Sequence, residues 1–116
     1  MIPTRVHAVL DYLSAGALIL GPTLLGWRSG LRGPVAAAGL GTAAYSALTR
    51  YEGGLSGQIS MREHLGLDAA QGAAFCAAAL LLGEERRDVR LALAGYGLFA
   101  LAAAALTDRP RGDRRP

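Results

Sequence analysis

Apolar residues form four long runs along the chain, and charged residues barely enter them. The runs cover residues 6–27, 33–49, 65–83 and 91–107, and Asp11 and Asp68 are the only charged residues inside them. A soluble helical bundle needs a polar stripe along each helix, and these runs offer none. The pattern therefore predicts four helices that each cross a lipid bilayer.

The length and composition of the runs are compatible with this prediction. A membrane span needs about 20 apolar residues, with a range of roughly 17–25, so the second and fourth runs are short. Hydrophobic residues make up 52% of the chain before its 16 glycines are counted. Soluble domains reach roughly 45–50% with glycine included. The alternative, a soluble alanine-rich bundle, is disfavoured because the helices lack polar faces.

Local patterns predict where two of the helices begin. Ser60 and Glu63 have the spacing of a capping box, which predicts that the third helix opens there. Gly33-Pro34 is expected to open the second helix, with proline at the first helical position. The connections are then expected at residues 28–32, 50–60 and 84–90.

A short polar motif occurs twice, once near the beginning of each half of the chain. "RVHAVLD" at residues 5–11 returns as "REHLGLD" at residues 62–68, with arginine, histidine and aspartate at the same spacing. "LLG" and "ALT" recur later in both halves, and such periodic matches indicate duplication of a structural unit. The unit here is a hairpin of two helices.

This repeat defines the expected architecture. Residues 1–107 are predicted to form one transmembrane domain, with repeats at 1–54 and 58–107 and a polar, disordered tail at 108–116. Because each hairpin contains an even number of spans, both copies enter on the same side. We therefore expect an all-α, four-span transmembrane bundle made of two parallel helical-hairpin repeats, with both motifs at the same depth.

Several stretches also resemble a known family. "IPTRVHAVLDYLSAG", "ALTRYE" and "MREHLGLD" are similar to the small bacterial membrane proteins of the SPW-repeat type, and the resemblance covers nearly the whole chain. The Ser-Pro-Trp that defines the family is replaced by "GPT" at residues 21–23 and "AAL" at residues 78–80. The resemblance implies a multi-span helical membrane protein of bacterial origin, and it brings no established activity.

The repeated polar residues form the candidate site. Histidine and aspartate four residues apart share one face of a helix. An aspartate deep in a span costs about 2.5–3.5 kcal/mol, so each carboxylate needs a compensating partner. The candidate polar cluster comprises Arg5, His7, Asp11, Arg62, His64 and Asp68, with Glu52 and Tyr45 as second-tier residues.

Three roles suit this cluster. In the leading interpretation the polar groups satisfy one another and lock the two hairpins together in a structural or interaction protein. Alternatively, two histidines and two aspartates offer a divalent ion two nitrogens and two oxygens, or the two histidines hold a haem. Titratable groups inside a membrane also suit a proton or ion path. The metal candidates are His7, Asp11, His64 and Asp68.

The remaining sequence limits the classes of function. It has no glycine-rich phosphate loop, no Gly-x-Ser-x-Gly and no Cys-x-x-Cys, so we expect no enzyme and no cofactor beyond a divalent metal. No basic patch with interleaved aromatic residues predicts nucleic-acid binding. The expected partners are the lipid bilayer and another membrane protein or a second copy of the chain.

Arginine counts predict the orientation. Seven of the twelve arginines fall on the side of both termini and five on the opposite side. Because positive residues favour the cytoplasmic side, both termini are expected in the cytoplasm of a multi-pass bacterial inner-membrane protein.

Overall fold

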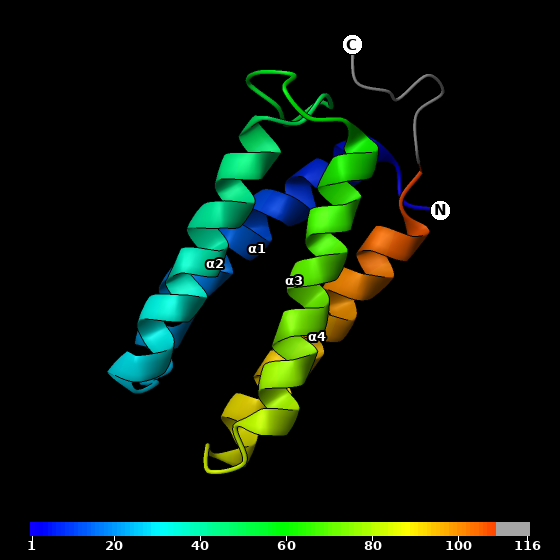
Figure 1. Ribbon diagram of the computed structural model, residues 1–116. Helices are drawn as coiled ribbons and strands as arrows, with labels where there is room; N and C mark the ends of the chain where they lie inside the picture. Colours follow the sequence, from blue (N-terminus) through cyan, green and yellow to red (C-terminus); the bar gives the residue numbers. More distant parts are fainter. Residues whose placement is uncertain (109–116) are drawn as a thin grey trace.

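The computed structural model describes residues 1–108, and within this range the chain is an all-α bundle of four helices (Figure 1). The helices are α1 (Thr4–Leu24), α2 (Ser29–Ala47), α3 (Met61–Leu81) and α4 (Arg87–Leu106). The predicted fold class is therefore confirmed. The predicted tail, residues 108–116, lies outside the described residues except for Asp108.

The capping-box prediction is confirmed, whereas the predicted start of the second helix is wrong. The Ser60 hydroxyl accepts from the Glu63 N–H at 3.1 Å, and the Glu63 carboxylate accepts from the Ser60 N–H at 2.9 Å. α2 begins at Ser29, so Pro34 lies inside the helix. Proline removes one backbone donor there, and the loss is tolerated because it falls near the beginning of the helix.

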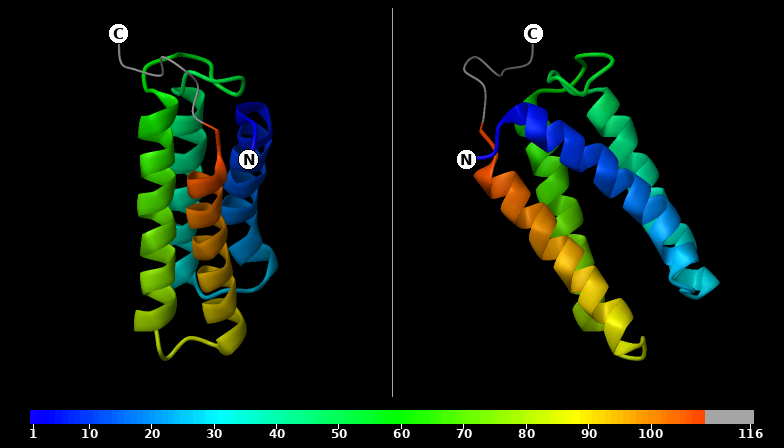
Figure 2. Two further views of the ribbon diagram at one scale, coloured as in Figure 1. Left: turned by 90° about the vertical axis from the view of Figure 1, so that its right-hand side faces the viewer. Right: turned by 180° about the vertical axis from the view of Figure 1, so that it is seen from behind.

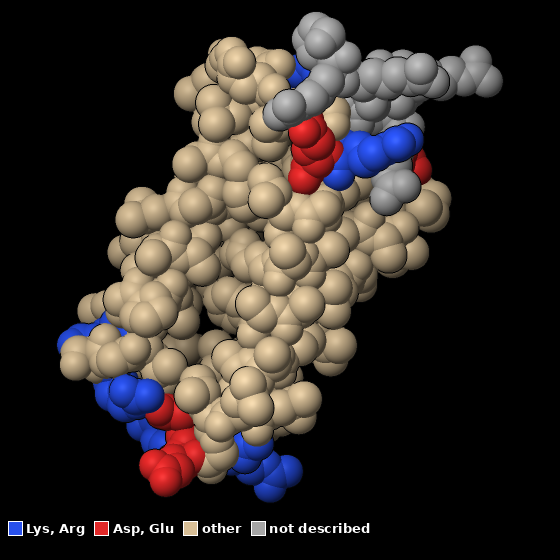
Figure 3. Space-filling model, in the orientation of Figure 1, with Lys and Arg blue, Asp and Glu red and all other residues tan. Residues whose placement is uncertain are grey.

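Three of the described helices, α1, α3 and α4, are long and apolar enough to cross a membrane. α2 is less apolar, because it is rich in glycine and alanine and has few large apolar side chains. On the face drawn in Figure 3, charged side chains gather at the two ends of the molecule and leave the middle free of charge. The bundle is 46 Å long, comparable with a bilayer of about 40–45 Å including its head groups. The chain is a membrane protein.

α2 also runs the full height of the bundle, because each hairpin begins and ends at the same end of the molecule. The Ile2 N–H donates to the carbonyl of Leu106 at 2.8 Å, so the beginning of the chain lies beside the end of α4. At the same end, the Ile59 N–H donates to the carbonyl of Leu48 at 2.9 Å. When α1 crosses the bilayer, α2 must therefore cross back.

Each hairpin is held together by a close helix contact at a glycine. A Cβ on Gly39 in α2 would lie 2.7 Å from the carbonyl oxygen of Ala15 in α1. A Cβ on Gly97 in α4 would lie 2.7 Å from the carbonyl oxygen of Gly72 in α3. Only glycine allows these backbones to approach so closely.

The two hairpins meet at the end where α1 begins and α4 ends, and they diverge toward the other end (Figures 1 and 2). At the far end, Arg28 forms an ion pair with Glu85, which joins the two short connections. Between the two ends lies an apolar core with residues from both hairpins, among them Leu18, Val35, Phe75 and Leu93. The polar candidate residues thus lie where the hairpins converge.

Candidate metal centre

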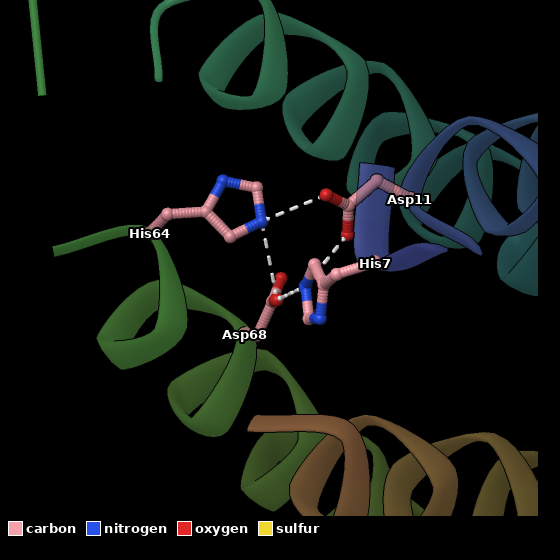
Figure 4. Close-up of side chains that lie close together, drawn as sticks. All are labelled: His7, Asp11, His64 and Asp68. Atoms are coloured by element: carbon pink, nitrogen blue, oxygen red, sulfur yellow. Dashed lines mark hydrogen bonds and ion pairs between the residues drawn. The ribbon is translucent and has the colours of Figure 1, made fainter. Parts of the chain in front are cut away.

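Four of the predicted site residues come together in one buried cluster. His7 and Asp11 lie on successive turns near the start of α1, and His64 and Asp68 occupy the same places on α3 (Figure 4). Each offers one ligand atom, and these four atoms lie within 4.8 Å of one another. All four residues are buried. We call them the His/Asp cluster.

The orientation of both imidazole rings is fixed by threonines at the ends of α2 and α4. Nδ1 of His7 lies 2.7 Å from the hydroxyl of Thr107, and Nδ1 of His64 lies 2.7 Å from the hydroxyl of Thr49. Each threonine hydroxyl donates its only proton to the carbonyl four residues earlier, at 2.6 Å. Its oxygen must therefore accept from the histidine, so both Nδ1 atoms carry protons.

The two Nε2 atoms consequently face the two carboxylates. Nε2 of His7 lies 3.1 Å from Asp11 and 2.8 Å from Asp68, and Nε2 of His64 lies 3.0 Å and 3.2 Å from the same carboxylates. Nε2 of His64 is fully buried and approaches both carboxylates, although neither contact has the alignment of a good hydrogen bond. With neutral imidazoles the cluster carries two negative charges, so it requires two protons or one divalent cation.

Two tyrosines hold the carboxylates from outside. Tyr45 of α2 donates a hydrogen bond to Asp68, and Tyr51 of the connection between α2 and α3 donates to Asp11. Burial and the hydrogen bond to Asp11 raise the pKa of Tyr51, so its phenol stays protonated and remains a donor. Both tyrosine rings also contact the ring of His64, with centroids 4.9 and 5.2 Å away. This second layer orients the carboxylates as second-shell groups do at metal sites.

The segment that carries Tyr51 is itself fastened to α1. The hydroxyl of Thr4 donates to the carboxylate of Glu52 at 3.1 Å, and the hydroxyl of Tyr12 donates to the carbonyl of Gly53 at 2.6 Å. Glu52, predicted as a second-tier residue, therefore lies at the edge of the cluster. It helps to hold the segment that carries Tyr51 against α1. Tyr45, the other second-tier residue, contacts the cluster directly.

The two arginines of the repeated motif are placed differently from the histidines and aspartates. Both are exposed. Arg5 lines a shallow groove on α1 together with Glu52, and Arg62 lines another groove between α3 and α4. The structure thus places both side chains at the surface, outside the four-residue cluster.

Three residues of this site were not predicted from the sequence: Thr49, Thr107 and Tyr51. The two threonines end the repeated "ALT", and this repetition was the available clue to their role. Tyr51 follows the first "ALT" by two positions, in a segment that carries no pattern of its own.

The geometry suits a small divalent ion. A tetrahedral ion with bonds of about 2.0–2.1 Å has ligands roughly 3.3 Å apart. The four nitrogen–oxygen separations are slightly shorter, between 2.8 and 3.2 Å, and they involve both oxygens of Asp11. The four ligand atoms lie within 4.8 Å of one another, so small side-chain shifts bring them to a common ion. A haem does not fit between the histidines, because the two carboxylates occupy the space between their Nε2 atoms. Two nitrogens and two oxygens match the ligand preferences of zinc and neighbouring transition metals.

Polar contacts continue a short way from the cluster into the bundle and then end. The side chain of Gln71 donates to the hydroxyl of Thr42 at 3.0 Å, and its amide nitrogen lies 3.5 Å from the hydroxyl of Tyr96. Beyond them the buried residues between the hairpins are mainly apolar. Among the described residues the polar contacts therefore do not continue to the opposite end, which does not favour a path across the membrane.

Comparisons with known proteins assign neither a family nor a function to this chain. No family model matches the chain, and no curated protein or solved structure matches it. The resemblance to the SPW-repeat proteins accordingly stays a prediction.

Proposed function

We propose that this membrane protein binds a divalent transition-metal ion in the His/Asp cluster, and that the ion joins its two hairpins. The observation that carries the proposal is the orientation of the imidazoles. Both Nδ1–H groups are held by threonine, so both Nε2 atoms point at the same two carboxylates, at distances of 2.8 to 3.2 Å. Anchoring of the distal ring nitrogen is how proteins prepare histidine for a metal.

A metal-free lock between the hairpins is the second candidate. Nε2 of His7 lies 2.8 Å from Asp68 in hydrogen-bond geometry, as expected for an imidazolium that donates to a carboxylate. Two such protons balance the two carboxylates as well as one divalent ion does. The protein then has a structural or interaction role, and the cluster only fixes how the hairpins cross.

Metal analysis distinguishes the two candidates. The protein is purified in detergent without chelator or added metal, and its metal content is measured before and after incubation with Zn²⁺. We expect about one ion per chain, lost when His7 and His64 are both changed to alanine. Val9→Ala together with Leu67→Ala is the matched control, because these two side chains lie on the same helices but are exposed, and this variant is expected to keep the ion.

The contrary result is equally clear. If the folded wild-type protein binds no metal after incubation with Zn²⁺ or Co²⁺, the metal proposal is wrong and the metal-free lock replaces it. Circular dichroism of each sample shows whether the helices are intact, so loss of fold is not mistaken for loss of binding.

The remaining assignments are also proposals. We place the protein in a bacterial inner membrane with both termini in the cytoplasm, a placement that the arginine count supports. We propose that the hairpins are copies of one unit, because matched residues make like contacts: His7 with Thr107, and His64 with Thr49. We assign the cluster a binding role and not an enzymatic one, because the sequence contains no known catalytic pattern. A second copy of the chain is the simplest protein partner.

A further inference from the structure

The two sides of the His/Asp cluster differ although the residues of the cluster match. Thr49 and Thr107 occupy equivalent places, 58 positions apart, and each accepts from a histidine at 2.7 Å. The same spacing pairs Tyr45 with Ala103. Tyr45 fills its side of the cluster and donates to Asp68. On the other side a methyl group stands in place of a phenol.

A narrow cavity occupies the place that the missing phenol leaves open. It is lined by the small side chains of Ala100 and Ala103, and it reaches His7, Asp11 and Asp68. Ala100 is itself the counterpart of Thr42 at the spacing of 58. Both replacements therefore remove volume and a hydroxyl from the same side of the cluster.

The cavity is polar as well as small. The side chains of Ser14, Thr42 and Tyr96 line it opposite the carboxylates. Its space is sufficient for about one water molecule, and several hydroxyl and carboxylate groups are there to hydrogen-bond to it. Such a cavity suits a small polar guest, whereas the apolar core deeper in the bundle does not.

We infer that a small exogenous ligand, water or a donor of similar size, binds the metal ion from this cavity. This inference rests on the proposed function. The ligand takes a fifth position beside the four protein ligands, an expansion of coordination that zinc sites allow. Ser14 and Tyr96 hold the exogenous ligand, and Ala100 and Ala103 leave it room.

Cobalt and fluoride, an anion about the size of a water molecule, provide the probes for this inference. The chain is loaded with Co²⁺, whose visible absorption reports the number and type of its ligands, and fluoride is then added stepwise. We expect a saturable change in the cobalt bands of the wild-type protein. Ala103→Tyr restores the phenol found on the other side, so the change is expected to disappear while the cobalt content remains one per chain.

Two further variants keep the test decisive. Ala102→Tyr is the matched control, because Ala102 is exposed on α4, and it is expected to respond to fluoride like the wild type. Ala100→Thr adds the smaller side chain found at Thr42 and is the substitute if Ala103→Tyr fails to fold. It is expected to weaken the fluoride response at least tenfold.

The possible outcomes distinguish this inference from the metal-binding proposal on which it rests. Failure of the wild-type protein to bind cobalt overturns both. Cobalt binding without any response to fluoride overturns the fifth position alone and leaves a closed metal site. A response in Ala103→Tyr or Ala100→Thr equal to that of the wild type shows that fluoride reaches the ion elsewhere, and the cavity is then the wrong place.

Discussion

The threonines that hold the histidines are the residues on which the metal proposal depends most directly. Changing Thr49 and Thr107 together to valine keeps the shape of the side chains but removes the acceptor for each Nδ1–H. Second-shell changes of this kind typically cost 10–100-fold in metal affinity, and we expect a loss in that range. Competition with a chromophoric chelator measures the affinity.

A structural role alone predicts a different result for this variant. A buried donor left without an acceptor costs about 1–3 kcal/mol, so some loss of thermal stability is expected in either case. Only a metal role also lowers the affinity for Zn²⁺. Thr23→Val, on the exposed surface of α1, is the control and is expected to change neither quantity. Unchanged affinity in the double variant would argue against preparation of the rings for a metal.

At the residue scale, sequence predicted the pairs within one helix and named Tyr45 as a second-tier residue, but it did not predict the threonines that hold the histidines. His7 and Asp11 share a face because helical spacing is fixed, and the repeat supplied His64 and Asp68. The Thr107 hydroxyl reaches His7 across a separation of 100 residues. Such a contact depends on how the hairpins cross, which no local pattern specifies.

At the scale of elements, two glycines in the same helix make a matched comparison. A Cβ on Gly39 would lie 2.7 Å from the backbone of α1, so Gly39→Ala forces α1 and α2 apart. Overpacking of this kind typically costs 1–3 kcal/mol, and we expect a lower midpoint of thermal unfolding in detergent.

Gly41 is the control for this change, because nothing lies within 4 Å of a Cβ built there. Gly41→Ala gains helix propensity of up to about 1 kcal/mol and is expected to be neutral or slightly stabilising. Equal destabilisation by both changes would mean that glycine serves α2 through backbone flexibility and not through the helix contact.

Sequence patterns predicted the beginning of a helix correctly where that beginning depends only on neighbouring residues. The capping box needs only Ser60 and Glu63, so it was predictable. The start at Pro34 was wrong because α2 continues backward to Ser29 through polar residues, which an apolar pattern does not count. For the same reason α4 begins at Arg87, ahead of its apolar run.

At the scale of the whole molecule, the hairpins are joined by chemistry of different kinds at each end. The His/Asp cluster joins them at the end where α1 and α3 begin, and the ion pair of Arg28 with Glu85 joins them at the other end. The arginine side chain of that pair is 56% exposed, and exposed pairs contribute little. The His/Asp cluster is therefore the stronger polar connection, and an ion bound there is placed to govern the angle between the hairpins.

The contacts between the two chain ends lead to a prediction about topology. The Asp108 N–H donates to the carbonyl of Ile2 at 2.9 Å, so the chain enters and leaves the bundle at one end and the number of crossings is even. A reporter active only in the cytoplasm is expected to work after residue 116 and to fail in the connection at residues 82–86. A reporter active only outside the cytoplasm should give the reverse pattern.

If the two positions report the same side, α4 does not cross, and the short, alanine-rich helices would have to pack as a soluble bundle without polar faces. If both reporters are inverted, the four crossings stand and the bias of seven arginines over five does not set the orientation. The His/Asp cluster would then draw its metal from the periplasmic side, where exchange with external metal requires no passage through the membrane.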